Sequence, residues 1–395
     1  MNGSHVCPVC EDSDVFGFFE IAQIPVQDGI LWPTREEATH SPTGRIHLSL
    51  CENCGYIWND AFEPGKIRYI PGYNFSLWHS PVYQDFVREL TADLVSTYDL
   101  RGKNIIEIGC GDGHFLNAIC ALGRSRGIGF DPVHQHRLDA KSDDQVQFVQ
   151  DFYSDKYAEL KADFICCRQV LQSISHPSQP KSFLTGLRKT IAREGVALYF
   201  EVPNASYILG QQIYWFVTYE YSSYFTAHSL SRLFESCGFE VCRASPVYEY
   251  GQYLGIEAVP AVGTIRRQYG PHDGIQALKQ QASHFADAYR STIDTWRTRM
   301  EELRSSGKRV AAWGAGGRAI GFLNALQIRD QIPLVVDINP ERQGQYLPAT
   351  GQVVVSPQHL AEYRPDTLII TNPTYTNEIE RQVQQLGVAC EFLVL

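Results

Sequence analysis

The sequence has no long apolar run, no surplus of positive charge and no recognisable export signal. No apolar run in its 395 residues approaches the roughly 18–20 residues that a helix needs to cross a bilayer. Residues 1–5 lack the basic region and apolar stretch of a secretory signal. We therefore expect a cytoplasmic protein with no membrane partner.

Basic residues are too few for a nucleic-acid-binding protein. Lys and Arg number 34 and Asp and Glu number 44, which gives a net charge of −10. Because phosphate contacts need a basic face, this balance argues against nucleic acid and anionic membrane surfaces as partners. Apolar residues make up 44% of the chain and charged residues 20%, which is typical of a folded protein with a large core.

Length and pattern divide the chain into three parts. At roughly 150 residues per domain, the length predicts two or three domains. Residues 1–66 are rich in Cys, Pro and Gly, strands and helices alternate from about residue 103, and a second alternating series follows a Pro and Gly cluster near 255–275. We expect domains over 1–66, 67–258 and 259–395.

The alternation predicts α/β domains with parallel sheets. Short apolar runs bounded by glycine indicate buried strands, and longer periodic segments indicate helices. Strands that alternate with helices form right-handed parallel crossovers. The expected strands are 105–108, 127–131, 146–149, 162–167, 195–202, 308–313, 334–337, 352–355 and 366–370, and the expected helices are 80–98, 113–121 and 274–306.

Four of the eleven cysteines form two Cys-x-x-Cys pairs near the N-terminus. They are Cys7 with Cys10 and Cys51 with Cys54. Two such knuckles supply the four thiolates that a tetrahedral Zn²⁺ site needs, and a closed four-sulfur site is structural. The alternative is four unrelated buried thiols, which two repeated spacings make less plausible. The odd total and the scattered remainder predict reduced thiols and no disulfide framework.

A glycine-rich strand–turn–helix over 104–116 predicts a nucleotide-type ligand. Its pattern is an acid inside the strand followed by three alternating glycines, which let the backbone pass close to a ligand. Asp131 ends the next strand, where an acid can accept both ribose hydroxyls. This combination resembles the S-adenosylmethionine (SAM) loop of class I methyltransferases; the alternative is a nucleotide-like domain with an empty site. The resemblance implies cofactor contacts at Glu107, Gly109, Gly111, Gly113, Asp131, Asp151 and Arg168.

The chain as a whole resembles the zinc-containing, three-domain SAM-dependent C-methyltransferases that act on nucleotide-linked deoxysugars in antibiotic pathways. The stretches that carry the resemblance are 73–81, 219–225, 313–318, 337–344 and 371–373. It implies an N-terminal zinc-binding module, a class I Rossmann-like SAM domain and a second Rossmann-like α/β domain that positions the substrate. It also implies a small-molecule acceptor, either a nucleotide-linked sugar or another secondary metabolite.

The expected proton-abstracting residues depart from the pattern of that family. Glu220 matches the family acid, but Tyr221 stands where the family has His, Thr218 where it has Tyr, and Ser173 where it has a further His. A Tyr acts as a base only with a lowered pKa, whereas burial can raise the pKa of a Glu into a useful range. The candidate catalytic residues are Glu220, Tyr221, Tyr73, His79 and Tyr224.

The altered residues leave three hypotheses open. The enzyme methylates an acceptor that needs no strong base, or uses other residues such as His228, or binds SAM as a non-methylating, cyclase-like scaffold.

A second glycine-rich loop suggests a different function. The loop over 313–318, with Asp337 after the next strand, would by itself suggest an NAD-dependent oxidoreductase. Its G-x-G-G spacing is not the full dinucleotide-binding pattern. Arg318 at the helix start would instead pair with an anionic substrate group. The alternative is a structural turn that needs glycine for close packing.

Overall fold

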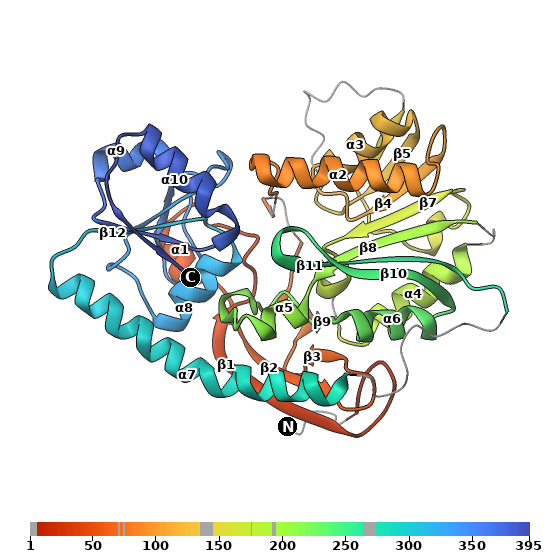
Figure 1. Cartoon of the computed structure of the whole chain (residues 1–395), viewed down its shortest axis with the longest axis horizontal. Helices are drawn as coiled ribbons and strands as arrows, with labels where there is room; N and C mark the ends of the chain where they lie inside the picture. The colour runs from red at the N-terminus through yellow and green to blue at the C-terminus, as the bar shows by residue number, and fades with distance from the viewer. Residues whose placement is uncertain are drawn as a thin grey trace.

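A computed structural model describes residues 6–69, 72–73, 76–134, 145–174, 176–191, 195–263 and 274–395. Residues 74 and 75 of the 73–81 stretch therefore lie outside the described part. The described strands form three sheets of four, seven and five strands. Figure 1 shows the five-stranded sheet and the seven-stranded sheet next to each other, with the four-stranded sheet below them.

The N-terminal sheet is antiparallel, and its strands pair in the order β1-β2-β3-β9. Its elements are β1 (Val15–Pro25), α1 (Arg35–Thr39), β2 (Thr43–Cys51), β3 (Ile57–Asn59) and β9 (Ser223–Tyr224). β9 comes from the middle of the chain and pairs with β3. The N-terminal module is therefore completed by a strand from the part of the chain that we expected to form the SAM domain.

The seven-stranded sheet has the order β10-β11-β8-β7-β4-β5-β6. β11 is antiparallel to both of its neighbours, and the strands from β8 to β6 pair in parallel. This is the sheet of a class I methyltransferase, so the expected fold class is confirmed. The strands are β4 (Asn104–Ile108), β5 (Arg126–Phe130), β6 (Val146–Val149), β7 (Phe164–Arg168), β8 (Ala197–Pro203), β10 (Phe239–Val247) and β11 (Tyr253–Pro260), and the helices are α2 (Pro81–Thr97), α3 (His114–Gly123), α4 (Gln179–Thr190), α5 (Ala205–Gly210) and α6 (Ala227–Ser236).

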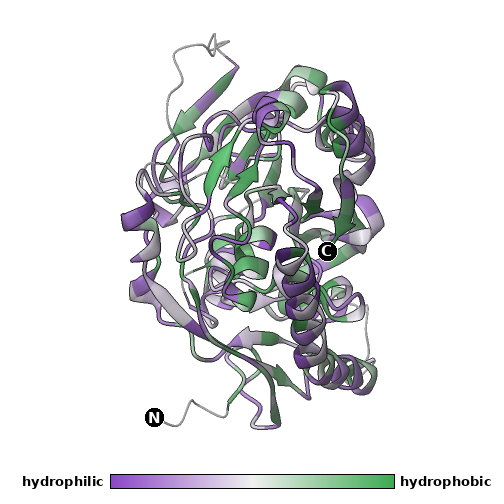
Figure 2. Cartoon of the chain, turned by 90° about the vertical axis from the view of Figure 1, so that its left-hand side faces the viewer, coloured by the Kyte–Doolittle hydropathy of each residue, from purple (hydrophilic) through white to green (hydrophobic). Residues whose placement is uncertain are grey.

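The C-terminal sheet is parallel throughout, in the order β14-β13-β12-β15-β16. This doubly wound order confirms the second Rossmann-like domain. Its strands are β12 (Val310–Trp313), β13 (Leu334–Val336), β14 (Val353–Val355), β15 (Thr367–Ile370) and β16 (Glu391–Val394), and its helices are α7 (Ile275–Ser305), α8 (Gly317–Leu326), α9 (Leu360–Tyr363) and α10 (Thr376–Gln385). Figure 2 shows hydrophobic colour on the inner strands and hydrophilic colour on much of the outer helical surface.

The long helix α7 connects the C-terminal sheet with the N-terminal sheet. It buries apolar residues at helical spacing, and its Phe285 ring lies 5.0 Å from the Phe19 ring of β1. The Tyr214 ring lies 4.4 Å from Phe285 on the same face. Figure 1 shows α7 running along the lower side of the molecule. Its contacts with β1 and α8 connect the N-terminal sheet to the C-terminal domain.

The sequence did not predict the antiparallel β10–β11 hairpin or the long strands of the N-terminal sheet. β11 continues to Pro260, two residues beyond the expected boundary at 258. The domain ranges 1–66, 67–258 and 259–395 stay predictions. Within the described residues, no helix combines the length and the apolar character needed to cross a membrane.

Close packing of α8 gives a test of the fold. A Cβ added at Gly321 would lie 2.9 Å from the backbone oxygen of Trp215, whereas at Gly186 in α4 it would meet nothing nearer than 3.9 Å. We expect Gly321→Ala to lower the free energy of unfolding by about 1–3 kcal/mol. The matched control Gly186→Ala should leave it unchanged or raise it by up to about 1 kcal/mol, because Ala favours helix. Urea unfolding measures both, and equal effects would contradict the packing.

Candidate active site

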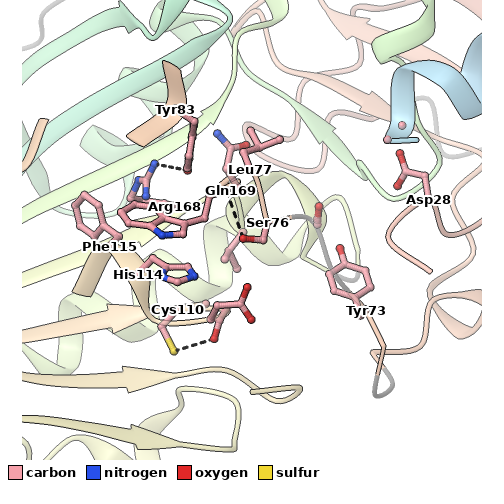
Figure 3. Close-up of a pocket in the computed structure, with 18 of the residues that line it drawn as sticks. Asp28, Tyr73, Ser76, Leu77, Tyr83, Cys110, His114, Phe115, Arg168 and Gln169 are labelled. Carbon is pink, nitrogen blue, oxygen red and sulfur yellow. Dashed lines mark hydrogen bonds between the residues drawn. The ribbon is translucent and has the colours of Figure 1, made fainter. Parts of the chain in front are cut away.

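One cavity of about 640 Å³ runs from the first glycine loop to the C-terminal sheet. Its walls include Glu107 and Asp131 from the seven-stranded sheet, Arg318 from α8 and Asp28 from the N-terminal module. Figure 3 shows part of this wall, with Asp28 beside a light-blue helix and across from Tyr73. Three separate parts of the chain thus contribute to a single cavity.

The first glycine loop has the backbone that its sequence predicts. Gly109, Gly111 and Gly113 have φ values of 74°, 51° and 79°, which side-chain-bearing residues rarely adopt. A Cβ at Gly109 would lie 2.1 Å from Val170, and one at Gly113 would lie 2.4 Å from the Phe148 ring. At Gly111 a Cβ would meet no atom within 4 Å, so the loop is open there to the cavity.

The two acids of this loop lie in the cavity wall. Asp131 accepts N–H groups of Gly111 (3.0 Å) and Val133 (2.9 Å), which fixes its carboxylate at the end of β5. Glu107 is 2% exposed, and its Oε2 is buried without a hydrogen-bond partner among the described residues. Burial raises the pKa of Glu107 to about 8. Glu107 Oε2 is therefore available to a ligand that carries hydrogen-bond donors and binds beside the open glycine loop.

Asp151 also lies in the cavity wall, but it is more exposed. It forms an ion pair with Lys156 at 2.9 Å and accepts the Tyr157 hydroxyl at 2.7 Å. The hydrogen bond from Lys156 is the main cause that lowers the pKa of Asp151 to about 2. The residue stays ionised and keeps lone pairs for a ligand.

Arg168 lines the cavity but is held mainly by protein groups. Its guanidinium binds Glu201 at 3.1 Å and the Tyr83 hydroxyl at 2.9 Å, and lies 4.4 Å from the Phe115 ring centroid. Glu201 is fully buried. This buried pair positions the end of β7 beside the glycine loop, and Figure 3 shows Arg168 next to Phe115 and Tyr83.

The four paired cysteines come together in the N-terminal module. Their sulfurs lie within 4.8 Å of one another, with 3.6 Å between Cys7 and Cys54 and 3.5 Å between Cys10 and Cys51. Four sulfurs about 2.3 Å from a central ion would be separated by roughly this much. The donor set and its spacing therefore fit a tetrahedral metal ion.

Glu220 lies behind the cavity wall and forms a buried carboxyl pair with Asp28. Its Oε1 accepts the N–H groups of Asp28 (2.7 Å) and Gly29 (3.1 Å), and its Oε2 accepts the Tyr73 hydroxyl (2.7 Å). Burial is the main cause that raises the pKa of both Asp28 and Glu220, and each side chain affects the pKa of the other. Two buried carboxyls that affect each other's pKa cannot both ionise easily.

The remaining catalytic candidates are placed very differently. Tyr221 lines the cavity, but burial and then the neighbouring charge of Asp28 raise its pKa well above the ordinary value. Tyr224 is not among the residues that line the cavity, and its hydroxyl donates to the Thr218 carbonyl at 3.0 Å. His79 is exposed and lies in the cavity wall with Tyr73. Neither Tyr221 nor Tyr224 is poised to act as a base.

The second glycine loop faces the same cavity and contributes positive charge. The Arg318 guanidinium is buried, donates to Gln252 at 2.5 Å and lies 4.9 Å from the Phe216 ring centroid. Arg342 is also buried and donates to the Ala315 carbonyl at 2.6 Å. Both arginines line the cavity, where they can meet an anionic group.

Sequence reasoning missed several residues of this wall. Asp28 follows β1 in no recognisable motif, and nothing in its neighbourhood signals a site. Trp78 and His114 stack with ring centroids 4.5 Å apart, next to the first glycine loop. Two signals were available, because Trp78 lies in the 73–81 stretch that carries the family resemblance and His114 directly follows Gly113.

Comparisons with known proteins match both large parts of the chain. A family model described as a methyltransferase domain matches residues 82–244, and one described as a C-methyltransferase C-terminal domain matches residues 271–394. The C-methyltransferase NovU from Streptomyces niveus is 23% identical over 389 residues, which cover 94% of this chain and 90% of that protein. The chain belongs to the SAM-dependent methyltransferases.

Other relatives of this methyltransferase match more narrowly. The ribosomal protein L11 methyltransferase from Actinobacillus succinogenes is 30% identical over 151 residues, which cover 34% of this chain and 50% of that protein. The solved magnesium protoporphyrin IX methyltransferase from Synechocystis PCC 6803 is 18% identical, with a TM-score of 0.34 over 46% of this chain and 80% of that one. A TM-score of that size adds nothing to the assignment.

Glu107 makes the stability of this methyltransferase depend on pH. Its pKa rises from 4.5 to about 8 on folding, so folding favours the protonated acid. That contribution is complete below about pH 4.5 and is lost as the pH rises towards 8, at about 1.4 kcal/mol per pKa unit. We expect Glu107→Gln to flatten this decline by a few kcal/mol in urea unfolding at pH 5, 6.5 and 8.

The control for this comparison is Glu89→Gln, which changes an exposed acid on α2. It should leave the pH dependence as it is in the unmodified protein. A Glu107→Gln variant whose stability declines with pH as steeply as the unmodified protein would contradict the raised pKa.

Proposed function

We propose that this methyltransferase transfers the methyl group of SAM to a carbon atom of a small acceptor that carries an anionic group. The observation that carries the proposal is the single cavity, which joins the open first glycine loop to Arg318 and Arg342. Donor and acceptor can therefore meet in one enclosed space. The full-length similarity to a C-methyltransferase supports carbon as the methylated atom.

SAM, when bound, supplies an electrophilic methyl group. We propose that Gly109, Gly111 and Gly113 shape its binding loop, that Asp131 accepts its ribose hydroxyls and that Asp151 lies beside its adenine. Each Asp131 oxygen has a second lone pair left for a hydroxyl after its backbone hydrogen bond. Glu107 offers a free acceptor for a donor group of the ligand. Arg168, held by Glu201, positions the loop from behind.

The acceptor class follows from the opposite wall of the cavity. Two buried guanidinium groups favour a phosphate or carboxylate, which fits a nucleotide-linked sugar or another anionic secondary metabolite. Tyr73 and His79 also line this cavity. A cytoplasmic location, where such metabolites are made, remains part of the proposal.

The second glycine loop fits a dinucleotide poorly. A Cβ at Gly317 would lie 2.2 Å from Asp28 Oδ2, so a carboxylate of the protein already occupies the start of α8. A pyrophosphate at that helix start would meet this negative charge. We therefore rank NAD-dependent oxidation below methyl transfer. The other alternative, a non-methylating scaffold, would bind SAM without consuming it.

We also propose that Cys7, Cys10, Cys51 and Cys54 hold a structural Zn²⁺. The ion would order the knuckles against the SAM domain, where Arg232 donates to the Asn53 carbonyl at 2.8 Å and Lys181 donates to the Val9 carbonyl at 2.7 Å. The domain ranges 1–66, 67–258 and 259–395 complete the proposal, with the N-terminal module also contributing Asp28 to the cavity.

Calorimetric titration with SAM tests the cofactor site. We expect a Kd in the micromolar range, about −8 kcal/mol, and no heat with NAD. Asp131→Ala should weaken SAM binding by at least about tenfold, because it removes acceptors that two backbone hydrogen bonds hold in place. The matched control Asp330→Ala changes an exposed acid away from the cavity and should bind SAM normally. NAD binding in place of SAM would overturn the proposal.

Removal of the metal tests the zinc site. One zinc per chain is expected by elemental analysis, and a strong chelator should lower the melting temperature because metal binding is coupled to folding. Cys51→Ser should reproduce this loss without chelator, whereas Cys242→Ser, at an exposed cysteine outside the cluster, should retain the metal. A metal-free preparation with an unchanged melting temperature would contradict the structural role.

A further inference from the structure

Asp28 is a buried acid in the cavity wall, and no sequence motif indicates a role for it. It follows β1 and is 5% exposed. Its Oδ1 is buried without a hydrogen-bond partner among the described residues, and its Oδ2 lies at the first residue of α8. An unpartnered carboxylate oxygen is costly to bury, so a partner that arrives in the cavity is the simplest explanation of its placement.

The contacts around Asp28 determine which member of the carboxyl pair is charged. Burial raises the pKa of Asp28, whereas its place at the positive end of the ten-residue helix α8 and the charge of Arg342 favour its ionised form. Burial and then the charge of Asp28 raise the pKa of Glu220 well above its ordinary value, so Glu220 holds the proton of the pair. A neutral Glu220 can still accept the two backbone N–H groups at Oε1 and the Tyr73 hydroxyl at Oε2.

We propose that Asp28 is the general base that takes the proton from the acceptor carbon, with Glu220 as the positioning residue that keeps Asp28 ionised. This inference rests on the proposed function, carbon methylation. It also explains how the chain works with Tyr221 at a position where a stronger base would be expected. Glu220 does not line the cavity itself, but its carboxyl accepts hydrogen bonds from Asp28 and Tyr73, which do.

The chemistry balances without a further reagent. The C–H bond next to a carbonyl breaks, its proton goes to Asp28 and its electron pair forms an enolate. The enolate carbon then bonds to the methyl group of SAM while the carbon–sulfur bond breaks and its electron pair stays on sulfur as S-adenosylhomocysteine. Asp28 afterwards releases the proton to solvent, so one proton is produced for each methyl group transferred.

The first test compares Asp28→Asn with the unmodified, zinc-loaded protein. The probe is a thymidine diphosphate-linked 4-keto-6-deoxyhexose, which carries both an anionic group and an acidic carbon. We expect kcat for methyl transfer to fall about 100-fold or more, while SAM affinity stays within about twofold. The matched control Asp294→Asn, at an exposed ion pair on α7, should retain full activity. Methyl transfer by Asp28→Asn at the normal rate would overturn the inference.

Deuterium exchange isolates the proton-transfer step. With S-adenosylhomocysteine bound in D₂O, the unmodified protein should exchange the C–H next to the ketone of the probe, and Asp28→Asn should not. Exchange that survives in Asp28→Asn would overturn the inference even if methylation were slow. A probe that the unmodified protein neither methylates nor exchanges counts against the proposed acceptor, and an acceptor-free measurement then decides the role of Asp28.

That measurement is the pH dependence of the free energy of unfolding between pH 5 and pH 8. Because the folded pair retains a proton that the unfolded chain loses, stability should decline with rising pH, and less steeply in Asp28→Asn and Glu220→Gln. The ionisable groups around the pair include Tyr69, Tyr73, Tyr221, Tyr224 and Arg342. All five remain in both variants. An unchanged slope in Asp28→Asn would overturn the shared proton and the inference with it.

The variant Glu220→Gln tests whether Glu220 controls the charge of Asp28 or only stabilises the fold. The amide cannot ionise but preserves an acceptor for the Asp28 and Gly29 N–H groups. We expect the activity of this variant to decline less steeply at alkaline pH than that of the unmodified protein, because the amide stays neutral there. A pH–activity profile of Glu220→Gln identical to that of the unmodified protein would overturn its role towards Asp28.

Discussion

The active site depends on one buried contact between segments that are far apart in sequence. Glu220, just before β9, accepts hydrogen bonds from the backbone of the loop after β1 and from Tyr73, which precedes α2. Asp28 in that loop reaches the start of α8. The N-terminal module, the SAM domain and the C-terminal domain meet at this point. The cavity exists because these three parts are held together there.

The two glycine loops show how similar local sequences acquire different roles. Both follow a parallel strand, and in both the acid of the next strand accepts a loop N–H, from Gly111 to Asp131 and from Ala315 to Asp337. They differ in what faces the helix start. Each loop has an open glycine, Gly111 in the first and Gly316 in the second. At the helix start, the first loop meets the Phe148 ring at Gly113, whereas the second meets the Asp28 carboxylate at Gly317.

Much of the fold could be predicted from the sequence because its signals are local. The apolar run of β4, the glycines that follow it and the cysteine spacings each depend on neighbouring residues, and the structure places them as expected in the sheet and the cluster. The β10–β11 hairpin was missed because β10 lacks a regular alternation of apolar residues. Its pairing with the rest of the sheet is a long-range property.

The candidate catalytic residues could be predicted only in part, because their surroundings depend on how deeply each side chain is buried behind the cavity wall. Tyr221 and Tyr224 are three positions apart, yet one lines the cavity and the other hydrogen-bonds the backbone behind it. Glu220 was predicted from its resemblance to a family acid, but its position one layer behind Asp28 is a property of packing. Asp28 itself lies 192 residues from its partner, a separation that no local motif can signal.

A crystal structure with bound S-adenosylhomocysteine tests the central claim most directly. The account predicts the ribose at Asp131, the loop backbone at Gly111 beside the ligand, and the sulfur facing the part of the cavity between Asp28 and Arg318. A ligand bound instead at the second glycine loop, or a sulfur facing away from Asp28, would contradict the account.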